Sequence, residues 1–157
     1  MRHRTKTHLL TQEQIDALFE RAEVGRLGTF SQDGYPYIVP MHFVYFNQTI
    51  YMHGLPVGQK IDNIKFNCNV CFEIDEMLSL LYKDVQNPCD VNTEFNSIIA
   101  QGQASIVEDF DEKQVALLKI IEKFTPHLIH NEMPKKMIQG TAVIRIDITQ
   151  CVGRYYK

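Results

Sequence analysis

The sequence predicts a mainly β protein with flanking helices. Three apolar runs follow one another early in the chain, and short turn signals separate them. The runs are Val24–Phe30, Tyr35–Phe46 and Thr49–His53. The breaks are Ser31–Gly34, Asn47-Gln48 and Gly54–Pro56. Alternating segments return later in the chain, and two amphipathic segments have helical periodicity.

The first helix is predicted to begin after Thr11, since Thr11 and Gln14 match a capping box. A short helix is expected from about Val57 to Phe66. An amphipathic helix is expected from Phe110 to Phe124, where Thr125-Pro126 ends it. We interpret these helices as packing elements.

The later strands are less sharply bounded. The predicted ranges are Val70–Asp75, which Leu78–Tyr82 would extend, then Glu94–Val107 and Gly140–Thr149. Gly102 marks a bulge or a close backbone approach. Residues 153–157 form an aromatic, basic tail that either crosses a dimer interface or stays in solvent.

The turn at Asn47-Gln48 fixes a register in which Phe46 lies opposite Thr49, and Tyr45 lies opposite Ile50. In this register His42 lies opposite His53. Side chains alternate between two faces along each strand. The predicted core face carries Met41, Phe43, Tyr45, Ile50 and Met52. The other face carries His42, Val44, Phe46, Thr49, Tyr51 and His53.

This second face is too apolar for solvent, so a ligand, a helix or another subunit is expected to cover it. Its two imidazoles, with Cβ atoms about 5 Å apart, could share a proton or bind a metal, an anion or a ring system. A cross-strand aromatic pair at an interface is the structural alternative.

Two further features of this region suit a ligand. Pro36 and Pro40 interrupt the second strand, which indicates either a protected edge or unpaired backbone beside the histidine face. Lys60 lies in the first turn of the short helix, where the free N–H groups and the helix dipole favour an anion such as phosphate. A solvated surface lysine is the alternative.

The length of 157 residues suits one domain, residues 1–157. The net charge of −3 gives no electrostatic case for nucleic acid or an anionic membrane. We expect a cytoplasmic protein with reduced cysteines, since no signal peptide or membrane span is recognisable. Met1–Thr7 is expected to be a basic arm. Cys68 and Cys71 form a C-x-x-C pair without a second pair of ligands, so no metal site is predicted.

Four segments in order, GRLGT, DGYPYIVPMHFVY, IYMHGLPVGQKIDNI and NVCFEID, resemble the flavin-binding split-barrel family. The chain is most similar to the nitroimidazole-resistance (Nim) branch, a relative of pyridoxamine 5′-phosphate oxidase. The resemblance continues through Phe95–Ala104 and Gly140–Thr149, and extends over nearly the whole chain from about Leu9. It implies a six-stranded Greek-key split β-barrel.

The resemblance also implies a homodimer with FMN at the subunit interface and a small-molecule substrate. The corresponding cofactor-binding positions are Val39, Pro40, Met41, His42, His53, Gly54, Lys60 and Ser97. Lys60 would contact the phosphate. His53 matches the histidine characteristic of the Nim branch, so it is the predicted catalytic residue, as proton donor or substrate-orienting group. His42 is the secondary candidate.

The chain departs from the family pattern in its positive charges. Relatives often carry arginines in the fifth-strand motif, where this chain has Asn96, Gln101 and Gln103. Oxidases of the wider family usually have arginine at the position of Val39, which argues against a pyridoxamine phosphate oxidase. Arg26 is a possible substitute if it points into the cleft.

We therefore expect an FMN-dependent oxidoreductase that reduces a small nitroaromatic substrate. Two alternatives stay open. One is a haem-binding member of the family, with His42 or His53 as axial ligand. The other is a flavin carrier or sensor without catalysis of its own.

Overall fold

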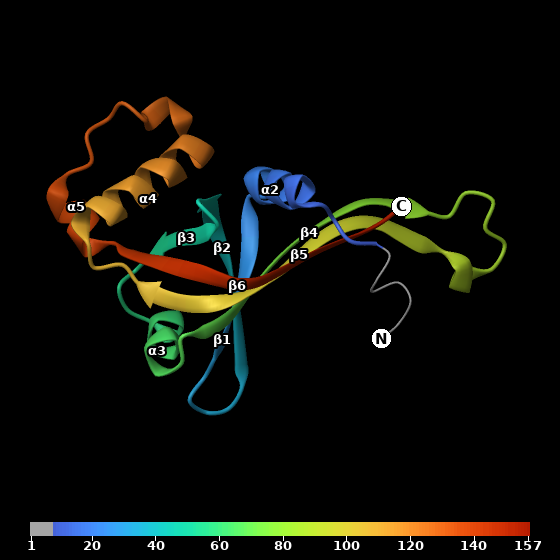
Figure 1. The fold of residues 1–157 in the computed structure, drawn as a ribbon, viewed down its shortest axis with the longest axis horizontal. Helices are drawn as coiled ribbons and strands as arrows, with labels where there is room; N and C mark the ends of the chain where they lie inside the picture. The colour runs from blue at the N-terminus through green and yellow to red at the C-terminus, as the bar shows by residue number, and fades with distance from the viewer. Residues whose placement is uncertain (1–7) are drawn as a thin grey trace.

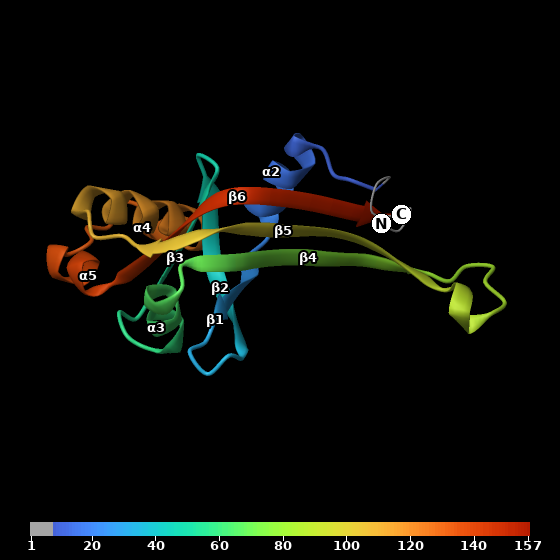
Figure 2. The same cartoon turned by 60° about the horizontal axis from the view of Figure 1, so that its bottom comes forward.

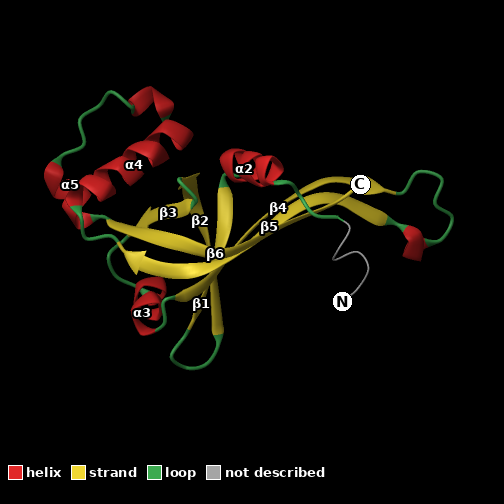
Figure 3. Cartoon of the chain, viewed as in Figure 1, coloured by secondary structure: helices red, strands yellow, loops and turns green. Residues whose placement is uncertain are grey.

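The computed structural model describes residues 8–157 (Figure 1). The predicted basic arm, residues 1–7, lies outside the described residues. The strands are β1 (Val24–Phe30), β2 (Pro36–Phe46), β3 (Thr49–Gly54), β4 (Asn69–Leu81), β5 (Asn92–Ile106) and β6 (Ala142–Tyr156). The α-helices are α2 (Gln12–Arg21), α3 (Gln59–Phe66), α4 (Phe110–Phe124) and α5 (Lys135–Gly140). Figure 3 shows the predicted class, mainly β with helices on the outside.

The six strands close into an antiparallel ring in the order β1-β2-β3-β6-β5-β4, because β4 pairs back onto β1. Strands β4, β5 and β6 follow one another as a meander, whereas the connection from β3 to β4 passes through α3 to the far side of β1. The predicted Greek-key split barrel is confirmed.

The split lies between β2 and β3. Their pairing runs from Phe46↔Thr49 only to Phe43↔Met52. β3 continues to pair with β6 as far as Gly54↔Ala142. The two strands therefore separate where His42 and His53 would be opposite each other.

The hairpin between β2 and β3 has the predicted register, with Tyr45 opposite Ile50. Asn47 and Gln48 both have positive φ, 51° and 59°, as a two-residue type I′ turn requires. The predicted core face is confirmed, since Phe43, Ile50 and Met52 are fully buried inside the ring.

Helix α4 covers the opposite face of the same hairpin. Val44 and Tyr51 are buried against Ala116, Leu117 and Ile120 of this helix. The Tyr51 hydroxyl also donates a hydrogen bond to Glu112 Oε1 at 2.9 Å, which ties the helix to the strand. The sequence left open whether a ligand, a helix or another subunit covers this face. Over Val44 and Tyr51 the cover is a helix, α4.

Helix α2 closes one mouth of the ring. Its capping box forms as predicted, with Thr11 accepting from the Gln14 amide and Gln14 accepting from the Thr11 amide. Leu18 and Phe19 are fully buried, and Phe19 stacks on Tyr45 with ring centroids 4.2 Å apart.

Strands β4, β5 and β6 continue beyond the ring as a long ribbon (Figure 2). The prediction that the last strand ends at Thr149 was wrong, because β6 extends to Tyr156, which pairs with Phe95. Residues 153–156 are thus part of the sheet and do not form a tail. Within residues 8–157, no helix has the length and apolar character to span a bilayer.

Candidate functional site

The junction between β3 and α3 brings a lysine back over the end of the strand. Gly58, with φ +117°, directs the chain into α3, and Lys60 lies in its first turn. A Cβ added to Gly54 would lie 3.4 Å from Lys60 Cε and 3.5 Å from Lys60 Nζ. The ammonium group and the unpaired amides of the helix N-terminus therefore lie close to the end of β3.

A buried polar cluster fixes α3 in this position. Asn63 is 4% exposed, and its Nδ2 donates to Thr29 Oγ1 of β1 at 2.9 Å. Ser31 Oγ accepts from Asn63 Nδ2 at 3.3 Å and from Gln59 Nε2 at 3.0 Å. These bonds hold the first turns of α3, and so Lys60, against the barrel.

His53 precedes Gly54 on β3, beyond the last β2–β3 pair. Its Nδ1 is buried and has no hydrogen-bond partner, the one such side-chain atom within residues 8–157. Burial lowers the pKa of His53, and the nearby His42 lowers it further. Both effects favour the neutral imidazole over the imidazolium.

His42 is exposed and stacks on Phe124, the last residue of α4, with ring centroids 4.6 Å apart and an interplanar angle of 24°. The end of α4 thus supports the His42 ring at the point where β2 and β3 part.

The other predicted β2 residues divide between two faces. Val39 and Met41 pack against the interior of the ring, whereas Pro40 is exposed. The β1–β2 pairing is continuous from Phe30↔Pro36 to Val24↔His42. The pairing with β3 stops at Phe43, so β2 has an open edge beside the histidines, as its two prolines indicated.

Ser97 lies elsewhere. It pairs with Asp75 and Arg154, on the ribbon side of the barrel. His53 pairs with Val143 on β6, and Arg154 is 11 residues further along the same strand, about 36 Å of extended chain. Within one chain the structure brings together His42, His53, Gly54 and Lys60, and leaves Ser97 apart.

Arg26 does not supply the positive charge that the fifth strand lacks. Its Nη1 is 2.9 Å from Glu73 Oε2 and 2.5 Å from Asp75 Oδ1. Both carboxylates belong to β4, and they neutralise the guanidinium. Lys60 is therefore the cation beside Gly54, at the end of β3.

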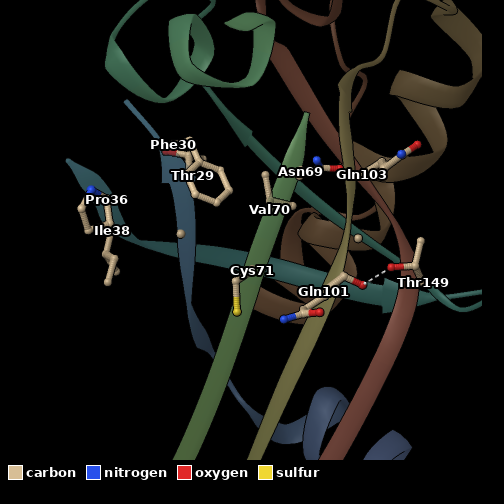
Figure 4. Close-up of a pocket in the computed structure, with 12 residues that line it drawn as sticks. Thr29, Phe30, Pro36, Ile38, Asn69, Val70, Cys71, Gln101, Gln103 and Thr149 are labelled. Carbon is tan, nitrogen blue, oxygen red and sulfur yellow. Dashed lines mark hydrogen bonds between the residues drawn. The ribbon is translucent and has the colours of Figure 1, made fainter. Parts of the chain in front are cut away.

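A pocket of about 540 Å³ on the outer face of the sheet was missed by the sequence analysis (Figure 4). Ile38, Gly28, Cys71 and Gln101 form one row of its lining across four neighbouring strands. Its size is typical of small-molecule sites. No sequence signal marks it, because its residues become neighbours only through the pairing of β1 with both β2 and β4.

A sequence model of the family described as pyridoxamine 5′-phosphate oxidase matches residues 11–155. Comparison with curated proteins finds no match. Among solved structures, a protein from Bacteroides thetaiotaomicron provisionally named as a 5-nitroimidazole antibiotic resistance protein is 26% identical, with a TM-score of 0.80 over 94% of this chain and 86% of that one.

Two more distant structures share the fold. A FAD-binding protein from Mesorhizobium loti is 21% identical, with a TM-score of 0.68 over 94% of this chain and 96% of that one. A FAD- and haem-binding protein from Mycobacterium smegmatis is 13% identical, with a TM-score of 0.84 over 94% of this chain and 72% of that one. The family match spans most of the chain, and so the protein belongs to the pyridoxamine 5′-phosphate oxidase family.

Proposed function

We propose that this protein binds FMN and is an oxidoreductase of the nitroimidazole-resistance type, which reduces a small nitroaromatic substrate. The main support for this proposal is the arrangement of side chains where β3 meets α3. There Lys60 and the helix N-terminus are next to a histidine whose buried ring nitrogen has no partner. Family membership and the 26% identity to the Bacteroides protein support it.

The residues present fit FMN. Lys60 Nζ and the first amides of α3 would hold the phosphate, because a cation and a helix N-terminus both favour an anion. The open edge of β2 would lie along the flavin ring, with Pro40 and His42 contributing side chains. Val39 and Met41 would contribute only backbone groups, since their side chains pack inward.

Bound FMN would supply the redox chemistry, accepting electrons from a reductant and passing them to the substrate. The chain's own part is to bind and orient. His53 would touch the ligand as proton donor or substrate-orienting group, and Gly54 would leave room for Lys60 to reach the phosphate.

We also propose a homodimer in the cytoplasm, with the cofactor between subunits. Ser97 is too far along the sheet to join the other predicted residues in the same chain, so it would serve the site of a second copy. Apolar side chains on the outer strand faces support such an interface: Ile38 is 65% exposed, Ile99 46% and Met77 60%. Sedimentation equilibrium of the purified protein tests this, and a monomer that binds FMN would contradict it.

Haem is the second candidate, favoured by the structural similarity to the FAD- and haem-binding protein and by the exposed ring of His42. A non-catalytic flavin carrier is the third. It would retain flavin that no pyridine nucleotide reduces.

The first experiment is the visible absorption spectrum of the purified protein, followed by heat release and identification of the chromophore. A two-band flavin spectrum with FMN released supports the proposal, whereas a Soret band after addition of haemin, without flavin, supports haem. Turnover of a nitroaromatic compound with NADH or NADPH then tests the reaction. Unchanged turnover in His53→Ala, with FMN still bound, would remove His53 from the mechanism.

A further inference from the structure

The two ring nitrogens of His53 have different surroundings. Within residues 8–157, Nδ1 is buried and has no hydrogen-bond partner. Nε2 is not one of the buried atoms without a partner, and no hydrogen bond between these residues involves it. Nδ1 therefore faces protein, and Nε2 is on the accessible side of the ring.

This asymmetry discriminates between the protonation forms of the ring. The imidazolium and the Nδ1–H tautomer both place an N–H donor at the buried nitrogen, where it has no acceptor. The Nε2–H tautomer leaves only a lone pair there. Orphaned buried N–H groups are the rarer and costlier case in proteins.

We propose that His53 is held as the neutral Nε2–H tautomer, and that it acts as a hydrogen-bond donor to an acceptor atom of the bound ligand. The burial of the ring and its proximity to His42, which both lower the pKa of His53, support the neutral form. Val143 is the residue of β6 that pairs with His53. Its side chain has no polar atom that could accept a hydrogen bond from an N–H at Nδ1.

An N–H donor at Nε2 determines which ligand atoms His53 can meet. Nε2–H pairs with a carbonyl oxygen, a bare ring nitrogen or a nitro oxygen, and not with a ligand N–H. Metal coordination through Nε2 would move the proton to Nδ1, and metal-bound histidines almost always donate that second N–H to an acceptor. Nδ1 of His53 has no such acceptor within residues 8–157, so His53 is unsuited to be an axial haem ligand or a base acting through Nε2.

The tautomer is read directly from the ¹⁵N chemical shifts of the histidine rings in the full chain, as purified and after removal of any chromophore. We expect a pyridine-type shift at Nδ1 of His53 and a pyrrole-type shift at Nε2. The exposed His130 is the control and should show both tautomers in exchange. A pyrrole-type shift at Nδ1 of His53 overturns the proposal.

The donor role rests on the proposed function and needs a second test. The amide nitrogen of glutamine can reach the position of Nε2, whereas that of asparagine reaches only the position of Nδ1. FMN affinity can be measured by the quenching of flavin fluorescence on binding. We expect the affinity of His53→Gln to stay within about 3-fold of that of the parent chain. The affinity of His53→Asn should fall about 10-fold, which corresponds to the loss of one hydrogen bond.

Equal losses in the two variants would overturn the donor role, provided that both variants show unchanged circular dichroism. A parent chain that binds no FMN would instead overturn the proposed function, and the ¹⁵N spectrum would still decide the tautomer. The two failures are therefore distinguishable.

Discussion

Lys60 folds back onto Gly54, so that a Cβ at position 54 would lie 3.5 Å from the lysine ammonium. We predict that Gly54→Val, whose branches extend further than Cβ, displaces the ammonium. FMN affinity should fall about 3- to 10-fold, as expected when one charged hydrogen bond is weakened. Fluorescence titration measures this. Gly140→Val is the control, because nothing lies within 4 Å of a Cβ at that position. Equal losses in both variants would contradict the prediction.

The charge of Lys60 can be tested separately from its position. Lys60→Met should weaken FMN binding about 10- to 100-fold, the worth of a hydrogen bond to a charged group. Binding of riboflavin, which lacks the phosphate, should be unchanged. Lys65→Met removes an exposed lysine from the last turn of the same helix and should leave both affinities intact. A similar loss for riboflavin would show that Lys60 does not act on the phosphate.

The bond between Asn63 and Thr29 should stabilise the fold as well as the site. Asn63→Ala leaves the buried Thr29 hydroxyl without its donor and removes one of the two donors to Ser31 Oγ, so the free energy of unfolding should fall by about 1–3 kcal/mol. Thr29→Val should cost less in the Asn63→Ala background than in the parent chain, because the two side chains share a bond. Urea denaturation measures both effects. Asn131→Ala, at an exposed position, is the control, and strict additivity would refute the coupling.

Lys123 links α4 to α2. Its Nζ donates to Ala22 O at 2.6 Å and Phe19 O at 3.1 Å, and it lies 4.2 Å from the centroid of the Phe43 ring. Lys123→Met should destabilise the protein by about 1–2 kcal/mol at pH 7, because two hydrogen bonds are lost.

The pH dependence of that loss has a defined sign. Burial lowers the pKa of Lys123 from 10.5 to about 8 in the folded protein. Between these values the unfolded chain binds the proton and the folded chain does not, so the parent gains stability as pH rises. The difference between the parent and Lys123→Met should therefore grow from pH 8 to 10.5. Lys119→Met, which removes an exposed lysine of the same helix, is the control. A constant difference would contradict the low pKa.

Local signals predicted most of the fold. The turn at Asn47-Gln48, where both residues have positive φ, gives the predicted β2–β3 register. Gly102 combines both of its predicted features: it lies at a register shift between β5 and β6, and a Cβ there would be 2.3 Å from Asp147 O.

The errors in the predicted secondary structure come from elements that depend on long-range contacts. The C-terminal half of β6 was missed because Gly153 interrupts its pattern. The structure explains this glycine, since a Cβ would lie 2.7 Å from Ile15 Cγ1 and 2.9 Å from Leu10 Cβ. Helix α5 was not predicted, because it has only six residues and one buried anchor, Ile138.

The candidate site was predicted in part. The sequence placed His42 opposite His53, but it gave no reason to expect Phe124, which lies more than seventy residues away and stacks on His42. It also grouped Ser97 with the other positions through family resemblance alone. Distances between strands that are not neighbours depend on how the ring closes, and hairpin register does not contain that information.

The closure of the ring through β6 has a consequence for folding kinetics. β3 gains its second neighbour only when Thr49 pairs with Asp147, a separation of 98 residues. Contacts of such sequence separation carry a large loop-closure entropy and are associated with slow folding. Until residues 142–156 are synthesised, one edge of β3 stays open to other chains. A nascent chain that ends before β6 is thus the species in which chaperone binding and aggregation should concentrate.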